Sequence, residues 1–480
     1  MKKNKITIIS IILIALLTII YVTKTFQNDT FYLVKVGEQI VKNGIDFKDH
    51  FSFHNLPYLY PHILFSIVVY VFYNLFANHG LYILTIIFSL ILSFIMYYVN
   101  IKNSKNKIIP LITTLLFVIY MVSFITLRAQ IASYSIFILE YYFLNKLLNT
   151  NKNRYIICTT LLAVLLVNTH VAVYPFFIIL FLPFIGEYIL NKILKKENFK
   201  IKKILISLLL ALLAGLASPL FLNSYTYLYN TLINNTTNYI DEHQPTVLYK
   251  DLRMIAMILI TIYLFVSKKI KLEIKEKLLL LGLIYMALSS IRHQSLLSIF
   301  LFIIINKHFS LYLSKERINE LENIITKPLG IGFTMVILLI LSVPITIKNI
   351  NSDYIDKEKY PVEAVEYIKE NLDYENIRIF NTYDIGSYLI LNDIKVFIDS
   401  RSDLYTYSYN KTRDIYDDYI NIMDFRAYYE NLFEMYNIDY VLMPSNNKLL
   451  VYLSYGNDKS LYAQEYKDES FTLLKRVVLK

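Results

Sequence analysis

The chain has 480 residues, of which 56% are hydrophobic and only 18% charged, whereas soluble globular chains are usually about a quarter charged. The formal net charge of +10 would suit a nucleic-acid binder, but the basic residues form short clusters between apolar runs. That distribution excludes nucleic-acid binding and is typical of an integral membrane protein. The single cysteine, Cys158, excludes an intrachain disulfide and a cysteine-based metal site.

Runs long enough to cross a bilayer core recur through the first 350 positions. The first run, from Ile6, follows a lysine-rich start and has no small-residue cleavage site after it. We therefore expect a retained first span with a cytoplasmic N-terminus. About eleven spans are predicted in all. Their approximate ranges are 6–24, 81–100, 108–126, 131–148, 155–171, 172–191, 204–222, 252–267, 277–291, 294–310 and 329–347.

One further apolar segment, about 62–77, decides the topology. It is short, begins at Pro61-His62 and is interrupted by Asn74, so we interpret it as an interfacial helix. With this choice the basic clusters all become cytoplasmic, as the positive-inside rule prefers. Residues 1–349 then form a membrane domain with long outer loops at 25–80 and 223–251.

Beyond about residue 350 charged and apolar residues alternate, which indicates a soluble extracytoplasmic domain over 350–480. Pro361 begins a predicted helix that extends to Leu372, and helices are also expected near 385–391, 409–421 and 424–436. Strands are predicted at 377–380, 395–398 and 440–443, with a closing hairpin near 463–467 and 471–477. Alternating strands and helices predict a small α/β domain with a mixed sheet.

Polar residues collect at the predicted outer ends of the spans and in the outer loops, where buried charge is expensive and is a sign of function. Each has a simpler interpretation: the arginines snorkel to headgroups, His170 is an interface histidine, Asp29 and Asp49 cap helices, and Glu242 is an ordinary loop charge. Together they suit a cavity that handles an anionic headgroup. The candidates are Asp29, Asp49, His62, Arg128, Gln130, His170, Glu242, Arg292 and His293.

Several motifs resemble, in order, those of a large bacterial membrane family that is similar to the GT-C class of glycosyltransferases, which use polyprenyl-phosphate sugars. The resemblance covers nearly the whole chain. The matching pieces are Asp29 to Gly37, Asn43 to His54, Tyr60-Pro-His62, Arg128-Ala-Gln130, Asn168-Thr-His170, Ser218 to Asn223, Glu242-His243, Arg292-His293, Ile379 to Leu389 and Val396 to Tyr405.

The resemblance implies a GT-C-like fold and a membrane glycosyltransferase that moves a sugar from a polyprenyl-phosphate donor to an envelope acceptor, which is a glycan, lipid or protein. It implies a catalytic carboxylate in the first outer loop, Asp29 or Asp49, acting as general base. Arg128 and Arg292 would hold the lipid phosphate, with His293 as a further candidate. No metal site is predicted, and the need for a cofactor is left open. The alternative is a non-catalytic bacterial membrane protein that handles lipid-linked glycans or assists envelope assembly.

The loop after the predicted strand 395–398 carries Asp399, Arg401 and Asp403. Ligand-binding residues gather at the carboxyl ends of strands in open α/β sheets, so this loop is an acceptor-side candidate. The alternative is an internal ion pair, Asp399–Arg401 or Arg401–Asp403, that shapes a strand-to-helix turn. The sequence leaves both interpretations open.

The topology predicts the outcome of reporter fusions. A reporter fused after Asn349 should read extracytoplasmic, and one in the loop Lys192–Lys203 should read cytoplasmic, because the lysine-rich loops stay on the inside. The opposite result at either fusion point would invert the predicted orientation.

Overall fold

The computed structural model describes residues 2–233, 240–456 and 459–477, and the chain divides into two compact units. Unit 1 comprises Met1–Lys24, Leu81–Ser224 and Thr237–Asn351. Unit 2 comprises Thr25–Gly80, Tyr225–Thr236 and Ser352–Lys480. The segment 25–80, which the sequence analysis assigned to the loops of the membrane domain, thus belongs to the same unit as the C-terminal segment.

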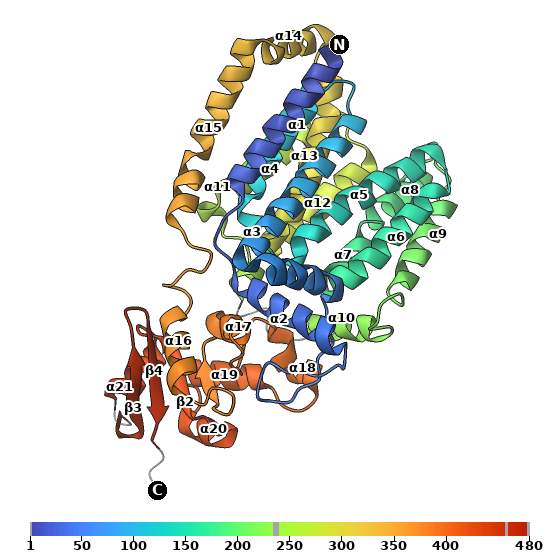
Figure 1. Ribbon diagram of the computed structural model, residues 1–480. Helices are drawn as coiled ribbons and strands as arrows, with labels where there is room; N and C mark the ends of the chain where they lie inside the picture. Colours follow the sequence, from blue (N-terminus) through green and yellow to red (C-terminus); the bar gives the residue numbers. More distant parts are fainter. Residues whose placement is uncertain (1, 234–239, 457–458, 478–480) are drawn as a thin grey trace. The chain divides into compact units, whose positions relative to one another are not determined.

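The regular structure among the described residues of unit 1 is entirely helical (Figure 1). Its helices are α1 (Lys2–Tyr21), the later part of α3 (Ile63–Lys102), α4 (Ile108–Met121), α5 (Ala129–Thr150), α6 (Arg154–Thr169), α7 (Tyr174–Ile179), α8 (Leu182–Ile193), α9 (Lys202–Ala214), α11 (Leu252–Val266), α12 (Ile274–Ser289), α13 (Gln294–Tyr312), α14 (Lys315–Thr326) and α15 (Pro328–Asn351). Neighbouring pairs include α5 with α6, α6 with α9, α4 with α13 and α12 with α13.

Four helical segments among the described residues are long and apolar enough to cross a membrane: Ile63–Lys102, Val171–Ile193, Ile291–Tyr312 and Pro328–Asn351. The last leaves large apolar side chains such as Leu329 and Phe333 exposed, as expected for a helix whose surroundings are lipid. Shorter apolar helices cover Lys5–Tyr21, Ile108–Phe124, Arg154–Thr169 and Leu252–Val266. The predicted apolar segments are therefore helical, although several are shorter than a full span.

Helix α3 is interrupted at the place where the sequence analysis separated an interfacial segment from a span. Phe76 and Ala77 have non-helical backbone angles, and Ala77 lies in the left-handed region at φ 47°. The segment before this kink belongs to unit 2 and the segment after Gly80 to unit 1. Gly37 of α2 (Asn28–Asn43) lets that helix approach the first segment closely, since a Cβ there would lie 2.1 Å from the carbonyl oxygen of Ser66.

Unit 2 contains a small mixed sheet with the strand order β1-β2-β4-β3. Strand β1 (Ile379–Asn381) runs parallel to β2 (Tyr440–Pro444), and β4 (Phe471–Arg476) is antiparallel to both β2 and β3 (Tyr462–Lys467). The buried β2 pairs Val441 with Phe380 on one side and with Leu474 on the other. The sequence analysis therefore predicted the mixed sheet and the closing hairpin correctly.

Several helices belong to unit 2 besides the sheet. They are α2, α10 (Asn223–Ile233, mostly in this unit), α16 (Val362–Asn371), α17 (Tyr383–Leu391), α18 (Tyr407–Asn410), α19 (Ile415–Met423), α20 (Tyr429–Tyr436) and α21 (Lys448–Tyr455). The helix predicted over 409–421 is two helices. Asn410 ends the first by donating to the carbonyl oxygens of Leu404 and Arg413, and Lys411 adopts a left-handed φ of 58°.

The predicted strand 395–398 is not a strand, because it makes only isolated bridges. Val396 bridges Ile379 on one side and Ser52, from the first loop, on the other. The Asn381 side chain accepts from Phe397 N at 2.9 Å and donates to Ile398 O at 2.8 Å. These side-chain hydrogen bonds replace the backbone hydrogen bonds that a neighbouring strand would make. Gly386 permits α17 to approach this segment, since a Cβ there would lie 2.0 Å from Ile398 O.

Candidate functional site

The predicted site residues fall into two groups, one in each compact unit. Unit 1 holds Arg128, Gln130, His170, Glu242, Arg292 and His293, and unit 2 holds Asp29, Asp49, His62, Asp399, Arg401 and Asp403.

The two candidate arginines of unit 1 both bind one short 3-10 turn, Asp241–His243. Arg128 Nη1 donates to Glu242 Oε1 at 2.6 Å, and Arg292 Nη1 donates to His243 Nε2 at 2.9 Å. Arg128 has extended backbone immediately before α5, and Arg292 lies in the 3-10 turn Ile291–His293 between α12 and α13. Three segments far apart in sequence therefore place two guanidinium groups beside one carboxylate.

Backbone hydrogen bonds fix the loop 241–251 against the junction of α12 and α13. Ile291 N donates to Gln244 O at 3.1 Å, and Thr246 N donates to Leu288 O at 2.9 Å. Gln294 Nε2 donates to Asp251 Oδ2 at 2.9 Å. These bonds hold the Glu242–His243 turn in place without using the side chains of the two arginines.

The electrostatics of this group favour an anionic ligand. Burial alone would raise the pKa of Glu242, but Arg128 and Arg292 hold it below its ordinary value. Burial, together with Arg292, lowers the pKa of His243 to about 4, so its imidazole is neutral near pH 7 and accepts from the guanidinium. Two permanent cations then face one carboxylate. Each guanidinium carries five N–H donors in a fixed planar arrangement.

His170 and Gln130 lie near the start of α5. His170 ends α6 and is buried, and its Nδ1 lies 2.9 Å from the hydroxyl of Ser133, one turn into α5. Gln130 is half-buried on the first turn. His293 Nδ1 lies 3.2 Å from Met286 O. His170 thus joins α6 to α5 next to Arg128, as the interface interpretation describes.

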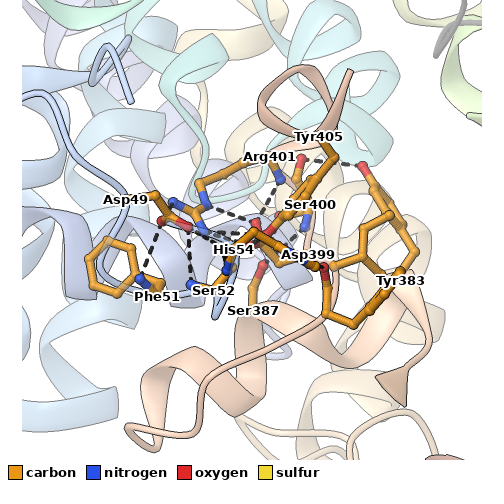
Figure 2. A network of polar contacts seen from close by, with 12 residues as sticks. Asp49, Phe51, Ser52, His54, Tyr383, Ser387, Asp399, Ser400, Arg401 and Tyr405 are labelled. Carbon is orange, nitrogen blue, oxygen red and sulfur yellow. Dashed lines mark hydrogen bonds and ion pairs between the residues drawn. The ribbon is translucent and has the colours of Figure 1, made fainter. Parts of the chain in front are cut away.

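The second group centres on Arg401, which is buried and contacts two carboxylates (Figure 2). Its Nη1 donates to Asp49 Oδ1 at 2.6 Å, while Nη2 and Nε donate to the two oxygens of Asp399 at 2.7 and 2.9 Å. The guanidinium carbon also lies 5.1 Å from the centre of the Phe51 ring and 4.9 Å from that of Tyr58. The Tyr405 hydroxyl donates to Asp399.

Asp49 has its remaining acceptor positions filled from its own loop. Its side chain is 0% exposed, and its oxygens accept from Phe51 N at 3.2 Å, Ser52 N at 3.1 Å and the Ser52 hydroxyl at 2.5 Å (Figure 2). Burial alone would raise the pKa of Asp49, but Arg401 and the Ser52 hydroxyl keep it below its ordinary value. A buried, fully engaged carboxylate is poorly placed to accept a proton from a substrate.

Asp399 and Arg401 therefore form the internal ion pair that was one of the two interpretations of the 399–403 loop. Asp403 has another partner, because its Oδ2 accepts from the hydroxyl of Tyr227 at 3.0 Å and lies 3.4 Å from that of Thr231. Both partners are in α10. Asp403 thus holds α10 against the C-terminal part of unit 2.

Asp29 lies in a more open position, in the first turn of α2. Burial raises the pKa of the Tyr360 and Tyr383 hydroxyls, and the negative charge of Asp29 raises it further. The neighbouring Asn28 donates to Tyr383 O at 3.0 Å. Asp29 itself is half-buried, and an acidic side chain is favourable at a helix N-terminus. His62 lies at the start of α3, with its ring 6.5 Å from that of Tyr32.

Sequence reasoning missed several residues of these groups. His243 was noticed only as a neighbour of Glu242, although adjacency to a candidate was a signal. Ser52 follows Asp49 by three residues, a spacing typical of side-chain-to-backbone turns, and this could have indicated a structural Asp49. Nothing in the sequence indicated the contacts of Arg401 with Phe51 and Tyr58. Within the described ranges no three His, Cys, Asp or Glu side chains are grouped to hold a metal ion.

Comparison with known proteins gives one structural match of interest. No protein-family model matches the chain, and no curated protein matches its sequence. The fold is similar to that of ArnT from Cupriavidus metallidurans, solved bound to undecaprenyl phosphate, with a TM-score of 0.59, 8% identity and 98% of each chain covered. At that identity the likeness concerns the fold alone. It confirms the predicted GT-C-like fold and, with the apolar helices, a membrane protein.

The Arg401 network predicts a large and specific loss of stability. Arg401→Ala should destabilise the full chain by about 3–5 kcal/mol, because it leaves Asp49 and Asp399 buried without their counter-ion. The matched control is Arg413→Ala, which removes a partly exposed pair with Asp418 and should cost about 1 kcal/mol or less. Thermal unfolding followed by circular dichroism measures both.

Lowering the pH provides a second readout of the same network. The folded-state pKa of Asp49 is lowered, so its contribution is complete above the unfolded-state value of about 3.9 and is lost as the pH falls below it. The stability difference between wild type and Arg401→Ala should therefore shrink on acidification. Equal effects of Arg401→Ala and Arg413→Ala at neutral pH would contradict this account.

Proposed function

We propose that this GT-C-fold membrane protein transfers a sugar from a polyprenyl-phosphate donor to an acceptor on the outer face of a bacterial cytoplasmic membrane. The observation that carries the proposal is the convergence of Arg128 and Arg292 on the Glu242–His243 turn, within a fold shared with ArnT over 98% of both chains. The structure of ArnT holds undecaprenyl phosphate, a lipid phosphate of the class proposed here for the donor.

The arginines would bind the phosphate of the donor and of the leaving group. A planar guanidinium can contact two phosphate oxygens at once, and donors fixed before the reaction stabilise developing charge without reorganising. The contacts of Arg128 with Glu242 and of Arg292 with His243 fix both groups. Gln130 and His293 are further candidates for headgroup contacts, and His170 supports Arg128 indirectly by joining α6 to α5. His62 keeps its predicted role at the lipid phosphate.

Asp29 is our choice for the general base. As the acceptor oxygen attacks the anomeric carbon, Asp29 takes the hydroxyl proton, the bond from that carbon to the phosphate oxygen breaks, and polyprenyl phosphate leaves. An attack opposite the leaving group inverts the anomeric centre. Asp29 is half-buried in the first turn of α2, whereas Asp49 is enclosed by Arg401 and its own loop. Unit 2 would then lie on the extracytoplasmic side, with Asp403 supporting α10 and not contacting the acceptor.

A transfer assay with purified protein and radiolabelled polyprenyl-phosphate sugars tests the proposal. Asp29→Asn should reduce transfer by about 10²–10⁴-fold while donor binding persists, because only the proton acceptor is removed. The control, Asp353→Asn, changes an exposed carboxylate of the same unit and should keep full activity. A folded wild-type protein that binds donors but transfers none of them would favour the non-catalytic alternative.

Phosphate recognition is tested by conservative changes at the arginines. Arg128→Lys or Arg292→Lys should weaken undecaprenyl-phosphate binding about tenfold or more, because an ammonium keeps the charge but cannot form the paired contacts. Arg154→Lys, at the start of α6 and exposed, is the matched control and should bind normally. Unchanged affinity in both test variants would mean that the arginines do not bind phosphate.

A further inference from the structure

A cavity of about 290 Å³ lies within unit 2, between the C-terminal half of α2 and the turn that follows α17. Of the residues described in the two candidate groups, Phe51 lines it, and none of the proposed catalytic or phosphate-binding residues does. We call it the α2 pocket and define it by the polar face of the helix together with the facing turn at 393–395. The helix face consists of Lys35, Glu38, Gln39, Lys42 and Asn43, which recur at three- and four-residue spacing.

The polar side chains of the α2 pocket hold one another in place. Lys35 pairs with Glu38 and, at 2.6 Å, with Asp393, and Lys42 donates to Glu38 at 2.6 Å. Asn43 donates to Gln39 at 2.7 Å. Asp393 adopts a left-handed φ of 62°, which is uncommon for a residue other than glycine. A ligand would therefore meet ordered groups, which reduces the entropic cost of binding.

The chemistry of the α2 pocket excludes some ligand classes. Lys35 and Lys42 are paired with Glu38 and Asp393. His50 is paired with Asp46, so Lys395 adds only one further positive charge to the lining. The pocket is therefore nearly balanced in charge and does not favour a phosphate. Five polar side chains on one wall make it unsuitable for a lipid tail. The ammonium, amide and carboxylate groups supply donors and acceptors in several directions.

The rest of the lining adds one apolar face to further polar groups. Phe51 is half-buried and supplies that face, with the almost fully buried Ile390 and Ile394 behind it. The polar groups are His50, Asp393 and Lys395. A sugar ring carries hydroxyl groups around its edge and C–H groups on its faces, so it needs this combination of a polar wall and an apolar wall. The volume is close to the lower end of the range for ligand pockets, about 300–1,000 Å³, as expected for a site that holds one ring.

We propose that the α2 pocket binds one pyranose unit of a glycan acceptor. That the bound glycan is the acceptor rests on the proposed function, in which Asp29, at the start of the same helix, is the general base for the acceptor hydroxyl. At a rise of 1.5 Å per residue, the pocket residues lie about 9–21 Å along the helix from Asp29. The bound unit is then remote from the reacting hydroxyl, and its binding energy helps to position that hydroxyl. The acceptor class is therefore an oligosaccharide of several units.

The chain contains no tryptophan, which permits a direct binding experiment on the full protein. Lys395→Trp places the single indole at the α2 pocket and keeps its helix face intact. Titration with N-acetylchitotetraose, maltotetraose and mannotetraose should change the indole fluorescence saturably for at least one of them. Phe425→Trp, exposed elsewhere in unit 2, is the control and should not respond.

A second variant separates binding in the pocket from non-specific effects. Adding Gln39→Ala to Lys395→Trp should weaken the response at least several-fold. No response to any of the three sugars up to about 10 mM, or an equal response with Phe425→Trp, overturns the proposal. A fluorescence response without transfer would refute the proposed function but keep the glycan site. Sugar transfer without a fluorescence response would support the proposed function and refute the glycan site.

Discussion

A permanently charged guanidinium cannot be buried unless its charge and its donors are compensated, and in unit 2 that constraint falls on Arg401. Asp399 supplies two contacts from the same loop, but the side chain reaches full compensation only with Asp49, Phe51 and Tyr58 from the first loop. The first loop is therefore part of the folded C-terminal unit. The bridge from Ser52 to Val396 and the hydrogen bond from His54 to Phe397 O, 2.8 Å long, follow from the same association.

This association also sets the position of α2. Phe26 N donates to Tyr354 O at 2.9 Å, Asn28 to Tyr383 O at 3.0 Å, and Lys35 pairs with Asp393. The helix that carries Asp29 at its start and the α2 pocket near its end is thus tied along its length to the C-terminal segment. A sequence change in that segment would act on the proposed catalytic carboxylate through α2, without touching any substrate.

The sequence predicted what depends on local pattern. Hydrophobic periodicity identified the apolar helices, and β-branched runs identified β1, β2 and the closing hairpin. It also placed Arg128, Glu242 and Arg292 in one set of candidates, and these three side chains do lie near one another. The contact of Asp49 with Arg401 joins positions 352 residues apart, and no spacing or propensity reports on such a pair. The strand expected at 395–398 failed for a related reason, since the Asn381 side chain takes over its hydrogen bonds.

Unit 2 is assembled from three stretches of chain, and Asp49 belongs to the first of them while Arg401 belongs to the last. During synthesis at about 5–20 residues per second, roughly 20–70 s pass between the two residues. During that interval Asp49 has been synthesised but Arg401 has not. The Asp49 carboxylate must therefore stay hydrated until the C-terminal segment is made. The pairing therefore makes folding of the first loop depend on the end of synthesis. A nascent chain that stops before residue 401 contains the membrane helices but lacks the guanidinium that pairs with Asp49.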